Sequence, residues 1–471
     1  MITEVIRRAL QVSLIRTPSS LSACACIRIY RDFGTSNLNA AFATAGSIDS
    51  NPRNAVVECV LNVSKQLGDN KFPNFCLIFA NAEHFGVHVS QISEWAREVF
   101  RSNTGQRPTV LGCVLQGVSS GSNRYLPSQP GVSLWAAHLP GVELIPFHTK
   151  GEDLPELPTG TWQRLVRRSM EKDTSTAALL FSPPHFFDNE LLMQRIRSAL
   201  PRSQIVGAIS CPGAWGPLQE SEGKQGWGAV YLDDKVMAKG VAVGCFLQGN
   251  FQLNTAIIPG FEPIGPSMTV TAAVRNLVLE LDGQEAHDKI REVAMEAHRY
   301  NSIHRSNLKL GLDDSFPETS RGLTEVVLRN DEGMVLRNWA AVPGASGRTA
   351  LLLPSIRDVL EGSRIQLHSR RGSIVMRNET ADAVKGLAAG STDAPPSPSG
   401  AADGASSSGA LLFSCSGLPN WEPSGVLASL PPSCALAGGK VEGEMGARGD
   451  RAPRLHSYSK LIAWFRGKPC N

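Results

Sequence analysis

The sequence predicts a mixed α/β and α+β fold, in which duplicated mixed β-sheets flanked by helices are followed by a C-terminal α+β region. Three observations predict this class. Apolar runs of strand length alternate with segments of helical period, the same order of segments occurs twice, and a turn-rich bridge then leads into further strands and helices. At 471 residues the chain can hold two or three domains, each with its own core.

The first copy begins with the apolar run Phe75–Ala80, continues with the amphipathic stretch Val89–Phe100 and reaches a second run at Val110–Leu115. This order predicts a βαβ unit, because a helix-period segment separates two runs of buried-strand type. Two more apolar runs, near 131–138 and 142–147, predict a β-hairpin that continues the unit.

The second copy repeats this order with segments at 177–181, 190–200, 205–211, 226–232 and 236–245. A duplication is the economical explanation, with internal copies at about 74–150 and 177–248. The loops Gly112–Gly117 and Gly207–Gly213 are then equivalent. We expect them at corresponding ends of two sheets, where paired loops form a cleft.

Further elements follow the two copies. Residues 259–266 are rich in proline and glycine and predict a rigid bridge, and Leu277–Leu281 predicts a strand closed by an Asp-Gly turn. Residues 390–409 are almost entirely Gly, Ala, Ser, Pro and Asp, which predicts a disordered insertion. The other predicted elements are helices at 285–300 and 379–389, strands at 322–328, 334–341, 365–368 and 410–415, and a helical tail at 458–465.

The first 34 residues differ from the rest of the chain. Their basic residues are five arginines, and their only acids are Glu4 and Asp32. An Arg-rich, acid-poor amphipathic segment is typical of an organelle transit peptide, so we expect residues 1–34 to direct import into a chloroplast or mitochondrion. The alternative is a leader without structure on a cytoplasmic protein.

Composition argues against several classes of partner. The 46 lysines and arginines nearly balance the 43 acids, and the formal charge of +3 favours neither nucleic acid nor a membrane surface. No apolar run approaches the ~20 residues of a spanning helix. The ten cysteines are scattered and lie mostly within apolar runs, which favours buried free thiols in a reducing compartment.

Motifs for chemistry are few. The sequence contains neither a His-Glu-x-x-His zinc motif nor a Gly-x-x-x-x-Gly-Lys-Ser/Thr phosphate loop. It therefore predicts no catalytic residue, no metal and no cofactor. The Gly117–Gly121 loop has the composition to hold an anion with its backbone N–H groups, and a plain tight turn is the alternative.

Four side chains stand at matching places in the two copies. His84 and His185 follow the first strand of each copy, where binding loops occur in open α/β sheets. Cys113 and Cys211 lie near matching ends of the next buried run. Contact with a small ligand is one interpretation of all four, and structural histidines with buried, satisfied thiols are the other.

The order of elements and several later motifs resemble a known family. In chain order these motifs are Pro263–Pro266, Val270–Thr271, Leu279–Gly283, Leu412–Cys415, Gly443–Gly446 and Leu455–Tyr458. They resemble the FIST domain, a sensory module shared by bacterial signalling proteins and by an F-box class of ubiquitin-ligase receptors. The resemblance places a FIST N-terminal region at 40–258 and a FIST C-terminal region at 259–471. One departure is Phe261, where the family commonly has a cysteine.

The resemblance implies a sensory or signal-transduction module that binds a small polar metabolite or amino acid. It also implies an alternative, a scaffold for a protein partner resembling the substrate-recognition part of an F-box receptor. A thiol enzyme that uses Cys211 or Cys415 is the third hypothesis. The expected ligand-binding residues, from the two copies and from the resemblance together, are His84, Cys113, Gly117, His185, Cys211, Gly265, Cys415, Gly443, Glu444, Gly446 and His456.

Overall fold

The computed structural model describes residues 39–467, except for residues 69–70, 82–84, 122, 126–128, 152–153, 155–174, 185, 187, 212–227, 238–239, 301–307, 314–333, 338, 344–347, 354–358, 372, 390–406, 419–429, 431–433, 448–452 and 457. The predicted transit peptide, the predicted strand at 322–328 and most of the predicted insertion lie outside the described residues.

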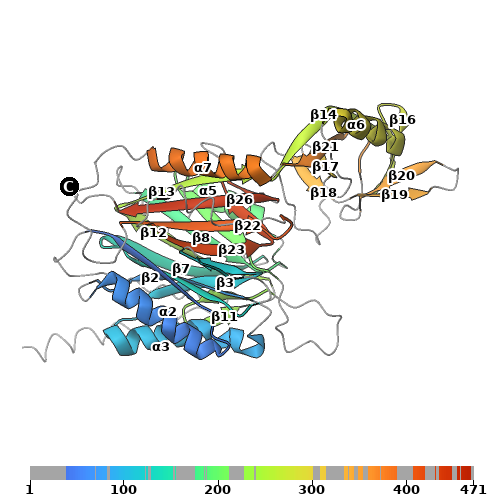
Figure 1. The fold of residues 1–471 in the computed structure, drawn as a ribbon. Helices are drawn as coiled ribbons and strands as arrows, with labels where there is room; N and C mark the ends of the chain where they lie inside the picture. The colour runs from blue at the N-terminus through green and yellow to red at the C-terminus, as the bar shows by residue number, and fades with distance from the viewer. Residues whose placement is uncertain are drawn as a thin grey trace, which may run out of the picture.

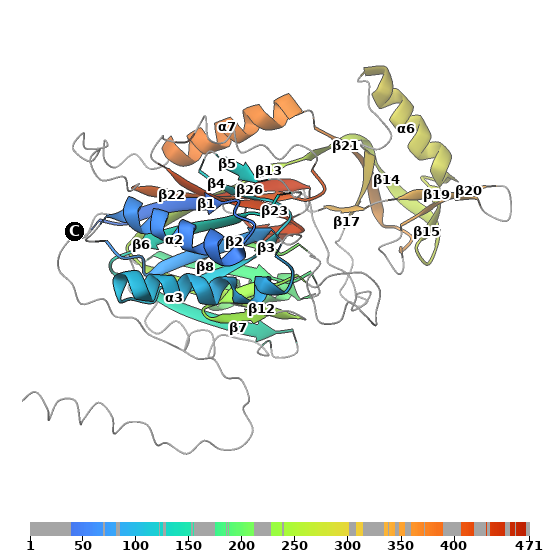
Figure 2. The same ribbon diagram turned by 60° about the horizontal axis from the view of Figure 1, so that its bottom comes forward.

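The described chain forms a main body (residues 39–259 and 371–467) and a second body (residues 261–370), which extends from one end of the main body (Figures 1 and 2). The main body consists of three units. Unit 1 contains β1 (Ala41–Ser47), α2 (Pro52–Leu67), β2 (Phe75–Asn81), η1 (Gly86–Gln91), α3 (Ile92–Thr104), β3 (Thr109–Leu115), β4 (Val118–Ser120), β5 (Asn123–Tyr125) and β6 (Val132–His138).

Units 2 and 3 follow along the chain. Unit 2 contains β7 (Val142–Lys150), β8 (Ser175–Ser182), α5 (Asn189–Ala199), β9 (Gln204–Ile209), β10 (Val230–Leu232), β11 (Lys235–Met237) and β12 (Val241–Gly249). Unit 3 contains β13 (Phe251–Pro259), α7 (Ser373–Ala389), β22 (Ser408–Cys415), β23 (Ala435–Val441), β24 (Gly443–Gly446), β25 (Arg454–His456) and β26 (Ser459–Gly467).

Local sequence explains where α2 begins and ends. The Asn51 side chain accepts hydrogen bonds from the N–H groups of Arg53 and Asn54, and Pro52 stands at the first helical position, where its missing N–H has no consequence. The helix ends before Gly68. One face of α2 is apolar and packs on the first sheet: Ala55, Val56, Cys59, Val60, Val63 and Leu67.

Three six-stranded sheets with one common topology form the main body. Their orders are β1-β6-β2-β3-β10-β11, β7-β12-β8-β9-β24-β25 and β13-β26-β22-β23-β4-β5. In each sheet only the central pair is parallel, namely β2/β3, β8/β9 and β22/β23. The duplicated mixed sheets and the fold class are therefore confirmed. The structure adds a third sheet of the same kind, which makes the main body pseudo-threefold.

Each sheet receives its last two strands from another unit. The β4–β5 hairpin of unit 1 completes the third sheet, β10–β11 of unit 2 completes the first, and β24–β25 of unit 3 completes the second. The exchange is cyclic, so no sheet is complete without a neighbouring unit. The predicted hairpin at 131–147 is wrong for a related reason: β6 and β7 are joined by a tight turn, but they belong to different sheets.

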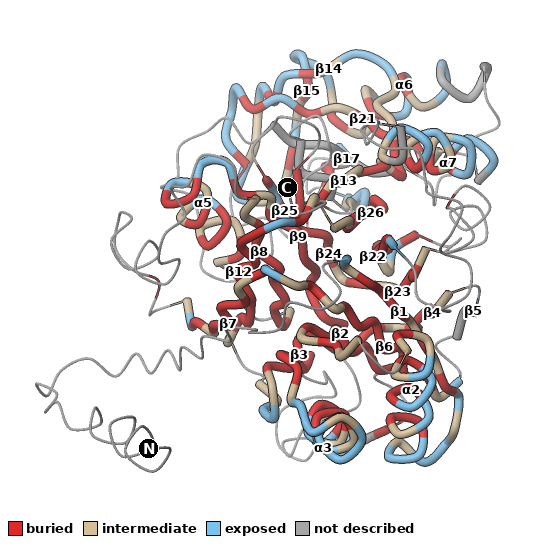
Figure 3. The backbone as a smooth tube through the Cα atoms, turned by 90° about the vertical axis from the view of Figure 1, so that its left-hand side faces the viewer, coloured by how far each residue is buried: buried red, intermediate tan, exposed pale blue. Residues whose placement is uncertain are grey.

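The cores follow the same symmetry. A central core is built from the inner faces of all three sheets, and a separate outer core lies between each sheet and its helices, with α2 and α3 on the first, α5 on the second and α7 on the third. Figure 3 shows the buried strands in the middle and these helices around them. Phe79, Phe181 and Phe413, one from each parallel pair, meet at the centre with ring centroids 5.7–6.0 Å apart.

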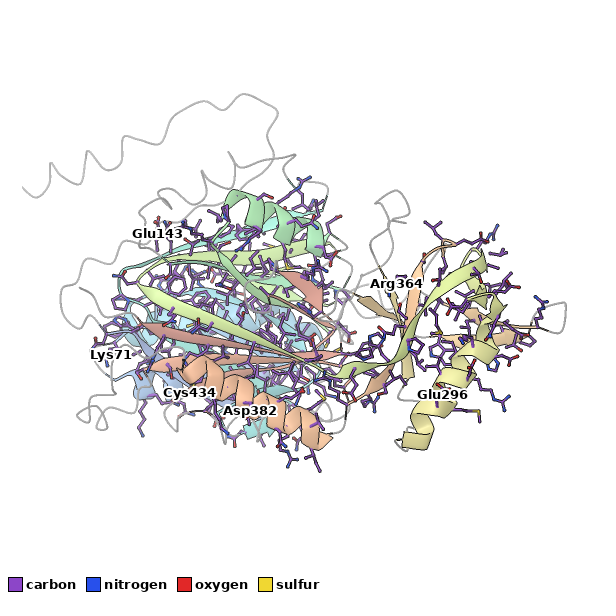
Figure 4. All side chains as sticks on the ribbon, turned by 90° about the horizontal axis from the view of Figure 1, so that it is seen from above. Lys71, Glu143, Glu296, Arg364, Asp382 and Cys434 are labelled. Carbon is purple, nitrogen blue, oxygen red and sulfur yellow. The ribbon has the colours of Figure 1, made fainter. Side chains whose placement is uncertain are left out.

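The second body is one sheet covered by one helix. It contains β14 (Phe261–Val274), β15 (Leu277–Leu281), β16 (Gln284–Glu285), α6 (Ala286–Tyr300), β17 (Leu308–Asp313), β18 (Met334–Arg337), β19 (Ala340–Pro343), β20 (Thr349–Leu352) and β21 (Arg364–Arg370). Figure 4 places Glu296 and Arg364 here, and Lys71, Glu143, Asp382 and Cys434 on the main body. The predicted Asp-Gly turn is confirmed, because Asp282 and Gly283 have φ of 50° and 78°.

A small apolar cluster joins the two bodies. Phe261 packs with Met376, Cys415 and Leu418, and its ring lies 5.1 Å from that of Tyr458. The chain leaves and re-enters the main body at one place, since the Arg371 N–H donates to the Gly260 carbonyl at 3.0 Å. The second body therefore stands on a two-stranded stem made of β14 and β21.

The first and last described strands of the main body meet as well. A Cβ atom on Gly467, at the end of β26, would lie 2.4 Å from the Cβ of Ala40, just before β1. The predicted helical tail at 458–465 is wrong, because these residues form β26, the strand between β13 and β22. Within the described residues, no helix is both long and apolar enough to cross a bilayer.

Candidate functional site

The carboxyl ends of β3, β9 and β23 meet on the pseudo-threefold axis. Each strand end donates a backbone hydrogen bond to the next unit, and the three bonds close a ring. The pairs are Gln116 N–H to the Lys440 carbonyl at 3.2 Å, Cys211 to Val114 at 3.0 Å and Glu442 to Ile209 at 3.1 Å. Open α/β sheets bind ligands at the carboxyl ends of their parallel strands. The three parallel pairs, β2/β3, β8/β9 and β22/β23, all have these ends at one place.

The strand-end site comprises the side chains around this ring: Cys113, Cys211, Cys415, Glu442 and Glu444. Cys113, Cys415 and Glu442 lie near enough to Cys211 to raise its pKa, and both glutamates raise that of Cys415. Four of the predicted residues are therefore brought together. Glu442 was not predicted from the sequence. It follows β23, which was not among the predicted strands, and only the sheet topology places it beside the ring.

The thiols of the strand-end site are buried and protonated. Burial raises the pKa of Cys113 well above its ordinary value, and burial together with the charge of Glu442 does the same for Cys211. For Cys415, burial and then the neighbouring Glu444 carboxylate raise the pKa to about 12. A thiol nucleophile reacts as the thiolate, the form that this environment disfavours.

Glu444 is a fully buried carboxylate in β24. The Ser459 hydroxyl donates to its Oε2 at 2.9 Å. His456 lies opposite Glu444 across the β24–β25 pair, and its Nε2 is 3.2 Å from the Gly446 carbonyl oxygen. A buried carboxylate beside hydroxyl and imidazole groups is suited to binding a polar or cationic group.

Three of the predicted glycines, Gly117, Gly443 and Gly446, lie in or beside the strands around the ring. Gly117 has φ of 101° where the chain passes from β3 to β4, and its carbonyl oxygen would be 2.3 Å from a Cβ on Gly439. Gly443 pairs with Ile209 beside the ring. A Cβ on Gly446 would lie 2.9 Å from Leu461 Cδ1. These positions shape the backbone of the site.

One predicted residue lies away from this site, and two others fall outside the described residues. Gly265 lies in β14 of the second body, where a Cβ would lie 2.4 Å from Val293 of α6. His84 and His185 lie outside the described residues. Among the residues that the structure does describe, no three His, Cys, Asp or Glu side chains are placed to hold a metal ion.

The segment Gly117–Gly121 also has the Gly-x-Ser-x-Gly spacing of a hydrolase elbow, which the sequence analysis overlooked. Such an elbow needs its serine on a sharp strand-to-helix turn. Here Ser119 is in β4, paired with β23, and its hydroxyl is buried without a partner in the described part of the chain. The segment therefore lacks the geometry of a nucleophile elbow.

Comparison with known protein families finds a match for part of this chain. Residues 74–284 match the FIST N domain, a family of sensory and signal-transduction domains. The match begins just before β2 and ends at β16, so it includes the first two parallel pairs.

The curated relatives are mycobacterial. An uncharacterized protein of Mycobacterium tuberculosis is 25% identical over 243 residues, which cover 52% of this chain and 57% of the relative. An uncharacterized protein of Mycobacterium bovis is 25% identical over 186 residues, which cover 40% of this chain and 43% of the relative. The chain thus spans about half the length of the curated relatives it matches.

Proposed function

We propose that this protein is a sensory module that binds a small polar metabolite, with amino acids as the first class to test, at the strand-end site. The observation that carries the proposal is the convergence of three parallel strand pairs on one axis, closed by the ring of three backbone hydrogen bonds. The match of residues 74–284 to the FIST N domain supports a role in sensing.

The chemistry of the strand-end site supports binding without catalysis. Its thiols are kept protonated by burial, while the Glu444 carboxylate and the Ser459 hydroxyl provide polar groups. A carboxylate held in a buried position attracts an ammonium group strongly, because it is shielded from water. An amino acid carries such a group.

The second body supplies a means of response. Its stem begins at Phe261, which belongs to the same apolar cluster as Cys415 of the strand-end site. A ligand that favours one position of this stem shifts the population of that position, and the second body transmits the change. We further assign residues 259–471 to a FIST C-terminal region, on the motifs quoted above.

The alternative is a scaffold for a protein partner, like the substrate-recognition part of an F-box receptor. Adjacent apolar residues on α7 favour it: Ile374 is 70% exposed and Val375 is 47% exposed. A pull-down with the full chain separates the two functions, because a scaffold retains a stoichiometric protein and a sensor does not.

Isothermal titration calorimetry with a panel of the common amino acids tests the proposal. We expect saturable heat for at least one of them, and at least tenfold weaker binding after Glu444→Gln, since loss of a charge-assisted hydrogen bond amounts to about 1.5–3 kcal/mol. Ser459→Ala is the milder variant if Glu444→Gln impairs folding. Glu143→Gln, in β7, is the matched control and retains wild-type affinity. Absence of heat across the panel would overturn the proposal.

A further inference from the structure

A polar cavity lies where the edge of the first sheet meets the edge of the third. Its volume is about 330 Å³, which is within the range of small-molecule sites. Three elements line it: β1 with Thr44 and Gly46, α2 with Asn62 and Lys65, and the β4–β5 hairpin with Ser120 and Asn123. The cavity is distinct from the strand-end site, with which it shares no residue.

Hydrogen bonds already fix the walls of this cavity. Gln66 Nε2 donates to the Thr44 carbonyl at 2.8 Å, and the Thr44 N–H donates to Gln66 Oε1 at 3.3 Å. The Thr44 hydroxyl lies 3.0 Å from that of Ser120 and 3.1 Å from the Leu436 carbonyl oxygen. The backbone around the cavity is therefore held between two sheets and one helix before any ligand binds.

The charge in the cavity has one sign. Among the described residues that line it, Lys65 is the only charged one, and it is exposed without a hydrogen bond or ion pair in the described part of the chain. The acid one turn before Asn62, Glu58, is outside the lining, and its carboxylate accepts the Ser47 hydroxyl at 2.5 Å.

Neutral donors surround this ammonium group. The side-chain amides of Asn62 and Asn123 can each donate two hydrogen bonds. The peptide N–H and carbonyl of Thr44 point away from β6 and bond to Gln66. In an antiparallel pair every second residue points its backbone groups to the same side, so the N–H and carbonyl of Gly46 also face away from β6. The lining thus combines one cation, several donors and no carboxylate.

We propose that this cavity binds a small metabolite through an anionic oxygen group, a carboxylate or a phosphate. The Lys65 ammonium provides the opposite charge, and the amides of Asn62 and Asn123 donate to the oxygens. Lys65 can pair with the anion without losing an existing contact, and charge-assisted hydrogen bonds of this kind are among the stronger ones.

Titration of the full chain with inorganic phosphate and, separately, with succinate tests this site by calorimetry at constant ionic strength. We expect saturable binding of at least one anion, weakened at least tenfold by Lys65→Gln. Lys71→Gln is the matched control, because Lys71 follows the same helix outside the cavity and its loss leaves the affinity unchanged. Asn62→Asp places a carboxylate in the cavity at an exposed helical position and abolishes binding.

The two anions distinguish two classes of ligand. Lys65-dependent binding of phosphate supports a phosphorylated metabolite, and Lys65-dependent binding of succinate supports a carboxylate. Failure of both anions to bind, or equal binding by Lys65→Gln, overturns the proposal. The two sites are tested with different ligands and different variants, so failure at the strand-end site and failure at this cavity are distinguishable.

Discussion

Phe79, Phe181 and Phe413 occupy equivalent positions, one in each parallel strand pair, and all three are fully buried. Their rings meet edge to face, with interplanar angles of 70–83°, the arrangement that aromatic pairs favour. Since each ring contacts the other two, one truncation leaves a hole that borders all three sheets.

We predict that Phe413→Ala lowers the free energy of unfolding by about 3–5 kcal/mol, the range for a fully buried phenylalanine. Urea denaturation followed by circular dichroism measures it. Leu61→Ala is the control: Leu61 is 47% exposed on α2, and its truncation changes stability by about 0.5 kcal/mol or less. Equal effects of the two substitutions would contradict the central position of Phe413.

The thiols of the strand-end site predict a loss of stability at alkaline pH. The pKa of Cys415 is raised to about 12 in the folded state, against an ordinary value of 9.0. Above about pH 9 the unfolded chain therefore loses this proton while the folded chain keeps it, and stability falls as pH rises through that window. Urea midpoints at pH 7 to 10 measure the slope, which becomes shallower after Cys415→Ala.

Iodoacetamide labelling with peptide mapping checks at neutral pH that the thiols of the strand-end site are protonated. The half-buried Cys434 has its pKa raised less, to about 11, so we expect it to react before Cys415 and Cys211. Rapid labelling of Cys415 in the folded protein would instead favour a thiol enzyme.

At the scale of elements, the three parallel pairs depend on one glycine each. A Cβ on Gly112, Gly207 or Gly438 would lie 1.8–1.9 Å from a carbonyl oxygen of the neighbouring strand. Since that oxygen belongs to the backbone, it cannot move aside without separating the pair.

We predict that Gly438→Ala destabilises the protein by about 3 kcal/mol, the upper part of the usual range for overpacking. Gly386→Ala is the matched control. Gly386 lies within α7, a Cβ there meets nothing within 4 Å, and alanine in a helix is about 1 kcal/mol more favourable than glycine. We therefore expect opposite signs for the two substitutions in thermal unfolding, and a neutral Gly438→Ala would contradict the close approach.

The sequence allowed some elements to be predicted and not others. The first two βαβ units were recognisable because runs such as Phe75–Ala80 are apolar and bounded by a helix-period segment. In the third, β23 contains Gly438-Gly439, which resembles a loop, and β26 is a short apolar run that periodicity alone cannot assign to helix or strand. The strand β1 and the helix α2 were missed as well.

The candidate site was predictable only in part, for a topological reason. Cys113, Cys211, Cys415 and Glu444 were singled out from the sequence, and they interact around one ring. The cyclic exchange of hairpins could not be inferred, because a strand's pattern shows which face is buried but not which sheet it joins. The cavity at Lys65 depends on that exchange, since β4 and β5 form its wall only by joining the third sheet.

At the scale of the whole molecule, the two bodies have separate cores. The central core and the three outer cores of the main body contain no residue of the second body, whose own core includes Met268, Ile290 and Leu351. Only the cluster around Phe261 is shared. The main body therefore has what it needs to fold without its appendage.

We predict that replacing residues 261–370 by a short Gly/Ser linker leaves a folded main body. The ends are already adjacent, because Arg371 donates to Gly260. Near-ultraviolet circular dichroism and a cooperative urea transition check the outcome, with some stability lost through the missing Phe261 contacts. A variant with native secondary structure but no cooperative transition would show that the second body is part of the folding unit.

The proximity of Gly467 to Ala40 has a consequence for how this chain can be rewired. The turn at 139–141 joins β6 to β7, Asn250 joins β12 to β13, and a short peptide from Gly467 to Ala40 would provide the third such link. A circular permutant closed there and opened at Gly141 should keep all three sheets. Cooperative unfolding of this permutant would show that the three units fold together whichever of them comes first in the chain.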